Sequence, residues 1–258
     1  MNDLGITIIL PALLAGLLVA ATHVPLGMQV LARGIVFIDI AIAQIAGVGV
    51  LAADLFGFPA EGVAVQVSAL SAALLGALLL TWTERRWPDV QEGIIGVVFI
   101  LAASAEILLL AGNPHAGEHL KDMLVGQILW VGTKQIVAVA LLTALVLIAW
   151  FGWSQRIGRI GFYLLFGLSV TASVQLVGVY LVFATLIIPA LATRDAKSWR
   201  LLKAYAVAAL GYALGLALST WFDLPSGAVV VWTLAAIGIL FFSFERSLSA
   251  TPESSPMR

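Results

Sequence analysis

Residues 161–193, GFYLLFGLSVTASVQLVGVYLVFATLIIPALAT, form one apolar run of 33 residues without a charged side chain. A transmembrane helix needs about 20 residues to cross about 30 Å of hydrocarbon. The run is therefore too long for one crossing and rather short for two full crossings. We expect a helical hairpin or a broken, partly re-entrant element, with residues 161–177 and 178–193 as its two halves.

The rest of the chain has the same character. Of its 258 residues 62% are hydrophobic and 10% are charged, and the mean hydropathy is +1.08. Soluble domains carry about 25% charged residues, so a soluble domain is excluded. We predict an all-α polytopic bundle of about eight to nine membrane segments, consisting of residues 5–24, 35–56, 61–82, 93–112, 134–153, the two halves above, 202–222 and 226–244. Residues 1–246 form one transmembrane domain in this interpretation, and residues 247–258 form a disordered tail.

The basic residues are distributed unevenly. If alternate loops face opposite sides, one side carries eleven of them and the other only Lys121 and Lys134. Positive charge favours the cytoplasmic side, so we expect the N-terminus outside and the C-terminus inside. The eleven are Arg33, Arg85, Arg86, Arg156, Arg159, Arg194, Lys197, Arg200, Lys203, Arg246 and Arg258.

The missing motifs exclude several kinds of chemistry. There are no cysteines, no phosphate-binding P-loop, no G-x-S-x-G elbow and no H-E-x-x-H zinc helix. We therefore expect no enzyme activity and no intrinsic cofactor in this chain. If the chain is a transporter, it uses an ion gradient or a separate ATPase as its energy source. We expect it to be surrounded by membrane lipid and to bind no nucleic acid.

Three polar side chains lie inside apolar segments, where an ionisable group costs a few kcal/mol or more. Asp39 and Gln44 fall on the second segment, about 140° apart around a helix, and Glu106 lies deep in the fourth. All three are candidates for a transport pathway. The structural alternatives are an ion pair between Asp39 and Arg33, and a partner for Glu106 on a neighbouring helix.

A second group of candidates lies in the longest stretch between segments, GNPHAGEHLKDML. His115, His119 and Asp122 would share one stripe if this stretch is helical, with Glu118 nearby. Imidazole and carboxylate together suit Zn²⁺ or Mn²⁺. A solvated loop with chance histidines is the alternative. The remaining histidine, His23, is expected at the membrane interface rather than in a metal site.

Small residues recur at Gly211, Gly215 and Ser219, a spacing that lets membrane helices approach closely. We expect this stripe to pack within the chain, and a dimer face is the alternative.

Two long segments resemble a known family. VPLGMQVLARGIVFIDIAIAQIAGVGV (24–50) and SVQLVGVYLVFATLIIPALATR (173–194), followed by DLPSG (223–227), resemble the metal-type permease subunits of bacterial ABC importers. MLVGQILWV (123–131) looks like a further segment of that family, with Val125 and Gln127 substituted.

The resemblance implies a function and partners. Two copies would form the channel, a cytoplasmic ATPase would supply energy, and an extracytoplasmic binding protein would deliver Zn²⁺, Mn²⁺ or Fe²⁺. The chain would lie in the bacterial inner membrane as the permease. We expect the transported metal, Zn²⁺ or Mn²⁺ first, to meet the outer group and then Glu106, Gln44 and Asp39.

The chain also departs from that family in two places. Members commonly carry an Asp and a His one turn apart on the second helix, and this chain has Ile40 and Gln44 at those positions, with Asp39 displaced by one residue. A Gln carbonyl is a weaker and harder ligand than imidazole, which favours Mn²⁺ or Fe²⁺ over tight zinc binding. The ATPase-docking segment is shortened to GWSQRIGRIGF (152–162), so residues 194–203 are a further candidate for coupling.

Other functions remain open. A permease for a metal chelate or a cobalamin-like cofactor would have a related helical plan but a longer chain. A gradient-driven secondary transporter could use Glu106 as a proton site. An intramembrane enzyme would need a convergent nucleophile and base, and the sequence shows none.

Overall fold

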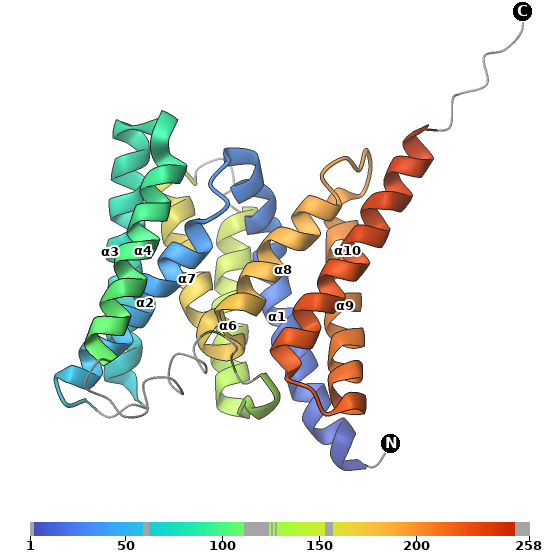
Figure 1. Cartoon of the computed structure of the whole chain (residues 1–258), viewed down its shortest axis with the longest axis horizontal. Helices are drawn as coiled ribbons and strands as arrows, with labels where there is room; N and C mark the ends of the chain where they lie inside the picture. Colours follow the sequence, from blue (N-terminus) through green and yellow to red (C-terminus); the bar gives the residue numbers. More distant parts are fainter. Residues whose placement is uncertain are drawn as a thin grey trace, which may run out of the picture.

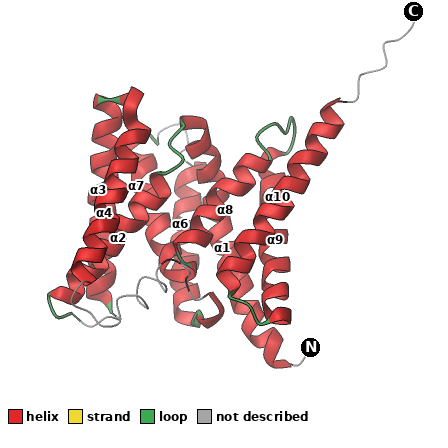
Figure 2. Cartoon of the chain, in the orientation of Figure 1, coloured by secondary structure: helices red, strands yellow, loops and turns green. Residues whose placement is uncertain are grey.

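The computed structural model describes residues 3–58, 62–110, 124, 126, 128–152 and 157–250, and this part of the chain contains helices and no strands (Figure 2). Eight helices are long and apolar enough to cross a membrane, and a ninth, α8, is shorter. The predicted all-α membrane bundle is confirmed. The helices are α1 (Asp3–Arg33), α2 (Ile38–Leu55), α3 (Val63–Arg86), α4 (Gln91–Leu110), α6 (Thr133–Gly152), α7 (Arg159–Val177), α8 (Val179–Ala192), α9 (Arg200–Phe222) and α10 (Ser226–Ala250), with short 3₁₀ turns at Pro88–Val90 and Ile128–Trp130.

The uncharged run folds as a broken pair of helices. Gly178 separates α7 from α8 with φ +83°, a conformation that favours glycine. Figure 1 shows α7 descending to this turn and α8 rising obliquely from it. A side chain at Gly126 would lie 2.3 Å from the Val177 carbonyl carbon, so the backbone at Gly126 packs directly against the turn. The predicted hairpin is thus present, with α8 as its short half.

Helix α1 is longer than the sequence indicated. We expected the first segment to end at residue 24, but α1 continues through Pro25 to Arg33. Membrane helices tolerate an internal proline where neighbouring helices support the backbone. Such a neighbour is present, because a side chain at Gly27 would lie 1.9 Å from the Leu186 carbonyl oxygen of α8.

The extension also changes the position of His23. The expected interfacial position is wrong, because His23 is fully buried inside the bundle. Its Nδ1 lies 3.0 Å from the Val19 carbonyl oxygen and 3.1 Å from the Thr22 hydroxyl. Local bonds to its own helix therefore satisfy one ring nitrogen.

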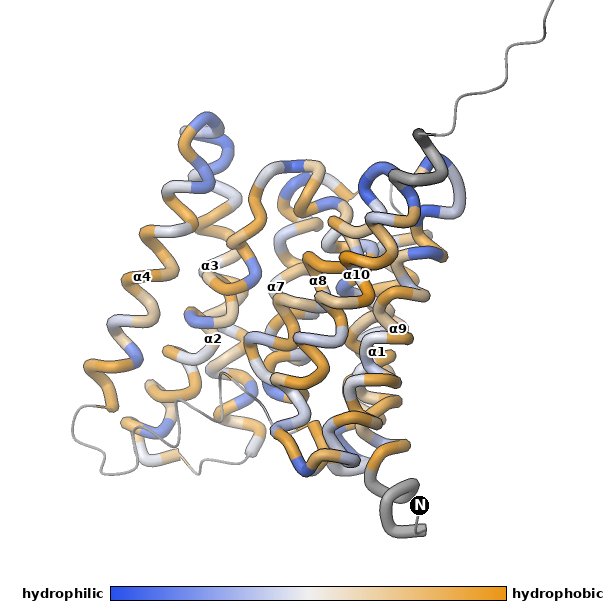
Figure 3. The backbone as a smooth tube through the Cα atoms, turned by 45° about the vertical axis from the view of Figure 1, so that its right-hand side comes forward, coloured by the Kyte–Doolittle hydropathy of each residue, from blue (hydrophilic) through white to orange (hydrophobic). Residues whose placement is uncertain are grey.

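The two ends of the bundle differ in charge. The C-terminal ends of α1 and α3 and the N-terminal ends of α7 and α9 meet at the upper end in Figure 1. Arg33, Arg85, Arg86 and Arg159 lie there, together with the basic residues of 193–203. Figure 3 shows hydrophilic residues gathered at this end. We call it the basic end. The described residues at the opposite end include one basic residue, Lys134.

The interior consists of two apolar clusters. One joins α2, α3, α4 and α7 around Ile42, Leu80 and Phe166, and the other joins α1, α8, α9 and α10 around Leu181, Tyr212 and Leu234. The predicted tail falls mostly outside the described residues, since α10 runs to Ala250.

The small-residue stripe of α9 packs against α10. A side chain at Gly211 would lie 2.3 Å from Leu234, and one at Gly215 would lie 2.6 Å from the Val230 Cα. The Thr233 hydroxyl lies 2.9 Å from the Gly211 carbonyl oxygen of α9 and also 3.0 and 2.9 Å from the Val229 and Val230 carbonyl oxygens of its own helix, so its one proton is shared among the three. The expectation that this stripe packs within the chain is confirmed. We call this contact the α9–α10 seam.

Candidate functional site

A cavity of about 640 Å³ lies between α2, α4 and α8, with Val231 of α10 at its edge. Its wall is mostly aliphatic and aromatic, but it includes Gln44 of α2 and Glu106 of α4. The structure therefore brings together two side chains that are 62 positions apart in the sequence and that we selected separately. We call this space the α2–α4–α8 cavity.

Glu106 is the most exceptional group in this cavity. The residue is 2% exposed, and its Oε1 has no hydrogen-bond partner among the described residues. A carboxylate in an apolar span normally pairs with another polar group or faces water. The structural alternative, a partner on a neighbouring helix, is therefore absent from the described part of the chain. The carboxyl group is thus buried at the cavity wall, with one oxygen lacking a partner in the described part of the chain.

Gln44 lies at a different depth in the membrane. It follows the start of α2 at the basic end by six residues, which is about 9 Å along the axis. Glu106 precedes the opposite end of α4 by four residues, which is about 6 Å. The two oxygen donors therefore succeed one another along the membrane normal. This arrangement suits a route for a cation better than one closed coordination sphere.

Tyr180 also lines the cavity, and sequence reasoning did not select it. It lies in the first turn of α8, directly after the Gly178 break. It is 55% exposed, so only part of the side chain can contribute to the wall. The signal in the sequence was weak, because tyrosine is common wherever a membrane helix reaches the interface.

Asp39 occupies a different environment. It is 1% exposed, does not line the α2–α4–α8 cavity, and has no hydrogen-bond partner for either carboxylate oxygen among the described residues. The alternative ion pair with Arg33 is not formed. The Arg33 guanidinium instead lies 4.1 Å from the centre of the Phe162 ring. Cation–π attraction takes the place of the ion pair.

The four residues expected to form an outer metal site cannot be placed in the structure. His115, Glu118, His119 and Asp122 lie outside the described residues. Within the described residues no three His, Asp or Glu side chains gather closely enough to hold a metal ion. The described site is thus an open cavity with scattered oxygen donors.

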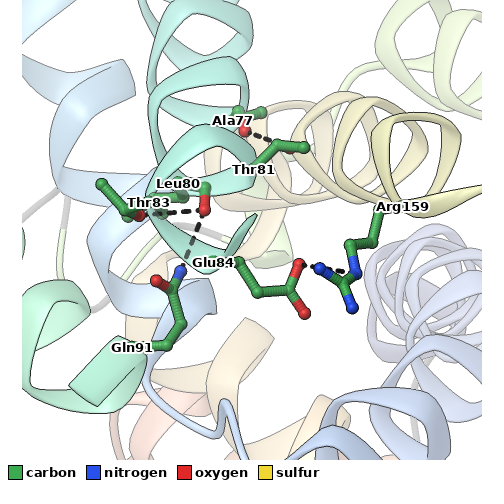
Figure 4. Close-up of polar contacts among 7 residues, drawn as sticks. All are labelled: Ala77, Leu80, Thr81, Thr83, Glu84, Gln91 and Arg159. Atoms are coloured by element: carbon green, nitrogen blue, oxygen red, sulfur yellow. Dashed lines mark hydrogen bonds and ion pairs between the residues drawn. The ribbon is translucent and has the colours of Figure 1, made fainter. Parts of the chain in front are cut away.

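The basic end contains a separate polar network that joins α3, α4 and α7. Figure 4 shows Glu84 of α3 pointing toward Arg159 of α7, with 3.7 Å between Oε2 and Nε. The Gln91 amide donates to the Leu80 carbonyl oxygen at 3.0 Å. Glu92 accepts a bond from the Phe37 backbone amide at 3.3 Å. These bonds link α3 to α4, α4 to the α1–α2 connection, and α3 to Arg159, which belongs to the segment expected to dock on an ATPase.

Comparison with known proteins supports the resemblance to ABC importer permeases that was noted from the sequence. The model of the ABC 3 transport family matches residues 5–158 and 150–245. The chain is 24% identical over 257 residues to a "Probable iron transport system membrane protein" of Haemophilus influenzae, covering 91% of this chain and 93% of the relative. It is 26% identical over 227 residues to the "Chelated iron transport system membrane protein YfeC" of Yersinia pestis, covering 79% of this chain and 75% of the relative.

Two solved structures share the fold. One is PsaBC from Streptococcus pneumoniae in complex with Fab, with a TM-score of 0.74 and 20% identity over 94% of both chains. The other is an inward-facing ABC transporter of metal-chelate type, with a TM-score of 0.64 and 18% identity over 93% of this chain and 85% of that one. The family model covers nearly the whole helical bundle, including the cavity and the basic end. The chain therefore belongs to the ABC 3 transport family, as a membrane-spanning transport subunit and not an enzyme.

Proposed function

We propose that this chain is the permease of an ATP-driven importer of a divalent metal ion: Zn²⁺ or Mn²⁺, with Fe²⁺ as a third candidate. The observation that carries the proposal is the α2–α4–α8 cavity, where Glu106 and Gln44 face one space inside the membrane. Carboxylate and amide oxygens suit Mn²⁺, whereas imidazole suits Zn²⁺ and Fe²⁺. The names of the two iron-transport relatives support the same class of cargo.

The cavity suggests an order of events for the ion. His115, Glu118, His119 and Asp122 would receive it at the outer mouth. Glu106 would neutralise its charge next, and Gln44 would follow nearer the basic end. Asp39 does not line this cavity, and it would act only on an ion that has passed beyond the cavity toward the basic end. Each donor is weak alone, so the ion can leave as well as enter.

Partners and orientation follow from the family and from the charge pattern. A cytoplasmic ATPase would drive the cycle, an extracytoplasmic protein would deliver the metal, and two copies of the chain would enclose the pathway. The basic end would face the cytoplasm under the positive-inside rule. The N-terminus would then be outside, the C-terminus inside, and residues 152–162 would face the ATPase.

The test is cellular metal content in a deletion strain grown under chelator and complemented with variants. We expect the wild-type chain to restore one of manganese, iron or zinc. Glu106→Gln keeps the size but removes the charge, and we expect about a tenfold or larger loss of uptake. Gln44→Ala should lower uptake less and shift the preference among the three metals.

Matched controls come from exposed residues of the same type. Asp54→Asn and Gln66→Ala lie on α2 and α3 outside the cavity and should leave uptake unchanged. Normal uptake in both cavity variants would remove these residues from the pathway. An unchanged metal content in the deletion strain would contradict the importer proposal itself.

A metal chelate is the second candidate cargo. The likeness to a metal-chelate type transporter and a mostly apolar cavity of about 640 Å³ favour it. Cavities of roughly 300–1,000 Å³ accommodate small organic ligands. Competition between free radioactive metal and the same metal in a chelate distinguishes the two cargoes.

A gradient-driven transporter is the remaining alternative, and membership of the ABC 3 family argues against it. Uptake that survives ATP depletion and stops with an uncoupler would favour it again.

A further inference from the structure

We propose that Glu92 of α4 is a positioning residue that connects residues 152–162, the segment expected to dock on an ATPase, to an aromatic gate beside the cavity. The gate is the pair formed by Phe37, at the start of α2, and Phe183 of α8. Their rings stack with 6.5 Å between centroids and 5° between planes. Phe183 also lines the α2–α4–α8 cavity. The inference rests on the proposed function, because it concerns how an ATPase would act on the cavity.

The gate lies where the cavity approaches the basic end. Phe37, Ile40 and Gln44 are spaced three and four residues apart, so they share one stripe of α2. Ile40 and Gln44 line the cavity, and Phe37 lies one turn closer to the basic end. An aromatic pair from α2 and α8 at this point narrows the route from Gln44 to the basic end.

The start of α2 needs an anchor outside its own helix. Phe37 stands at the N-cap position, where its side chain has no acceptor for the first backbone amides, and no side-chain cap bond is present there among the described residues. Gly34, just before it, has φ +68°, which favours glycine, and no described atom lies within 4 Å of its Cβ position. The α1–α2 connection can therefore pivot at Gly34.

Glu92 supplies that anchor. Its Oε1 accepts a hydrogen bond from the Phe37 backbone amide at 3.3 Å, across 55 positions of sequence. The helix dipole also favours a carboxylate beside the N-terminus of α2. Because Glu92 belongs to the first turn of α4, it moves with that helix. The position of Phe37 against Phe183 is therefore set by α4.

Helix α4 is itself fixed to α3 next to Glu92. The Gln91 amide donates to the Leu80 carbonyl oxygen of α3 at 3.0 Å, and Gln91 is buried. A hydrogen bond in the low dielectric of the interior is stronger than one in water. The start of α4 and the last turns of α3 should therefore move as one unit.

The same end of α3 contacts the docking segment. Figure 4 shows Glu84 beside Arg159, which belongs to residues 152–162, with 3.7 Å between the charged groups. Arg33 of α1 also contacts this segment, over an aromatic ring, but the pivot at Gly34 separates it from α2. The route through α3, α4 and Glu92 crosses no such pivot. Displacement of the docking segment can therefore reach the gate by that route.

The experiment measures access to a cysteine placed behind the gate, and the chain has no cysteine of its own. Ile40→Cys puts a thiol in the cavity wall, one turn beyond Phe37. Sealed vesicles of both orientations contain the full chain with its ATPase, and a sulfonated, membrane-impermeant maleimide is added outside. The labelling rate from the basic end reports how open the gate is. Phe37→Ala removes the aromatic pair, and we expect it to raise this rate about five-fold.

Variants of Glu92 separate positioning from a general effect of charge. Glu92→Met keeps the length of the side chain but removes the acceptor oxygen, so we expect labelling about five-fold faster than in the wild type. Glu92→Gln retains a carbonyl oxygen for the Phe37 amide and should label at nearly the wild-type rate. Asp89→Leu removes an exposed acid three residues away and is the matched control. Helical content by circular dichroism confirms that each variant is folded.

ATP tests the connection to the docking segment. In the wild type, ATP with vanadate should change the labelling rate of Ile40→Cys from the basic end. Glu92→Met should abolish this change, because the gate no longer follows α4. Glu84→Gln should reduce it, because the contact with Arg159 is partly exposed and is the weaker part of the route.

The possible failures are distinguishable. Labelling that is the same in the wild type, Phe37→Ala and Glu92→Met, together with normal ATP-driven uptake, would overturn the gate alone. Equal rates in Glu92→Met and Glu92→Gln would overturn the positioning role of the Glu92 oxygen, and so would a full ATP response in Glu92→Met. Labelling that depends on Phe37 and Glu92 but never responds to ATP in the wild type would overturn the connection to an ATPase together with the proposed function.

Discussion

The α9–α10 seam and the α2–α4–α8 cavity differ in how closely their helices pack and in whether their polar side chains have hydrogen-bond partners. In the seam, glycines bring two helices into contact, and the hydroxyl of Thr233 lies within bonding distance of Gly211 across the seam as well as of its own helix. At the cavity, about 640 Å³ remains open between the helices, and the Glu106 Oε1 has no partner among the described residues. Close packing in the seam stabilises the fold, whereas the buried carboxyl group of Glu106 in the cavity lowers its stability.

The largest effect should come from overpacking the seam. In Gly215→Leu, the new Cβ would lie 2.5 Å from the Thr233 Oγ1 and 2.6 Å from the Val230 Cα. Backbone cannot move aside cheaply, so we expect a loss of about 3 kcal/mol, or no folded protein. Gly96→Leu on α4 is the control, because no atom lies within 4 Å of its Cβ position. Thermal unfolding in detergent measures both, and equal stabilities would contradict the close contact.

Removing the buried acid from the cavity should have the opposite sign. Glu106→Leu replaces an unpartnered carboxyl with an apolar side chain, and we expect a gain of about 2 kcal/mol with loss of uptake. Unfolding in detergent and metal uptake are measured on the same variant. A decrease in stability would mean that Glu106 has a stabilising partner.

A smaller effect is expected from one hydrogen bond in the seam. Thr233→Val leaves the shape nearly unchanged but removes the hydroxyl that Gly211 shares with the Val229 and Val230 carbonyl oxygens, at a cost of about 1 kcal/mol or less. Uptake should remain normal. Thr220→Val is the control, since its hydroxyl bonds only within α9, to the Leu216 carbonyl oxygen. If both variants lose the same stability, the bond between the helices contributes nothing.

The smallest effect should occur at the basic end. Arg159 is half exposed in its contact with Glu84, so Glu84→Gln should cost about 1 kcal/mol or less. The control is Asp89→Asn, an exposed acid at the same end. Unfolding at low and high salt checks the ion pair, because salt should remove the difference between wild type and Glu84→Gln. A much larger loss of folding stability in Glu84→Gln would show that the ion pair between Glu84 and Arg159 is a major contribution to the stability of the bundle.

Much of the fold could be predicted because hydropathy acts locally. The break at Gly178 and the number of segments follow from run length, and the small-residue stripe follows from spacing alone. Pro25 misled the prediction of α1, because support from α8 at Gly27 is a tertiary contact that no local pattern reveals.

The cavity could be predicted only in part. Burial cost identified Glu106 and Gln44 one at a time, but not that they share a space, which depends on how α2 and α4 pack. Asp39 was selected for the same burial cost, but it does not line this cavity. Tyr180 was missed because a tyrosine near a helix end has a common alternative explanation.

The short helix of the hairpin, α8, affects how far an ion would have to travel through the hydrocarbon layer. Helix α8 has 14 residues, which is about 21 Å against about 30 Å of hydrocarbon, and it lies obliquely in Figure 1. Helix α8 alone therefore covers about two thirds of that thickness, and the Gly178 turn, packed against Gly126, lies beyond its N-terminal end. Because α8 also forms one wall of the cavity, that wall is shorter than the hydrocarbon layer, and an ion that used the cavity would be without water over a shorter distance.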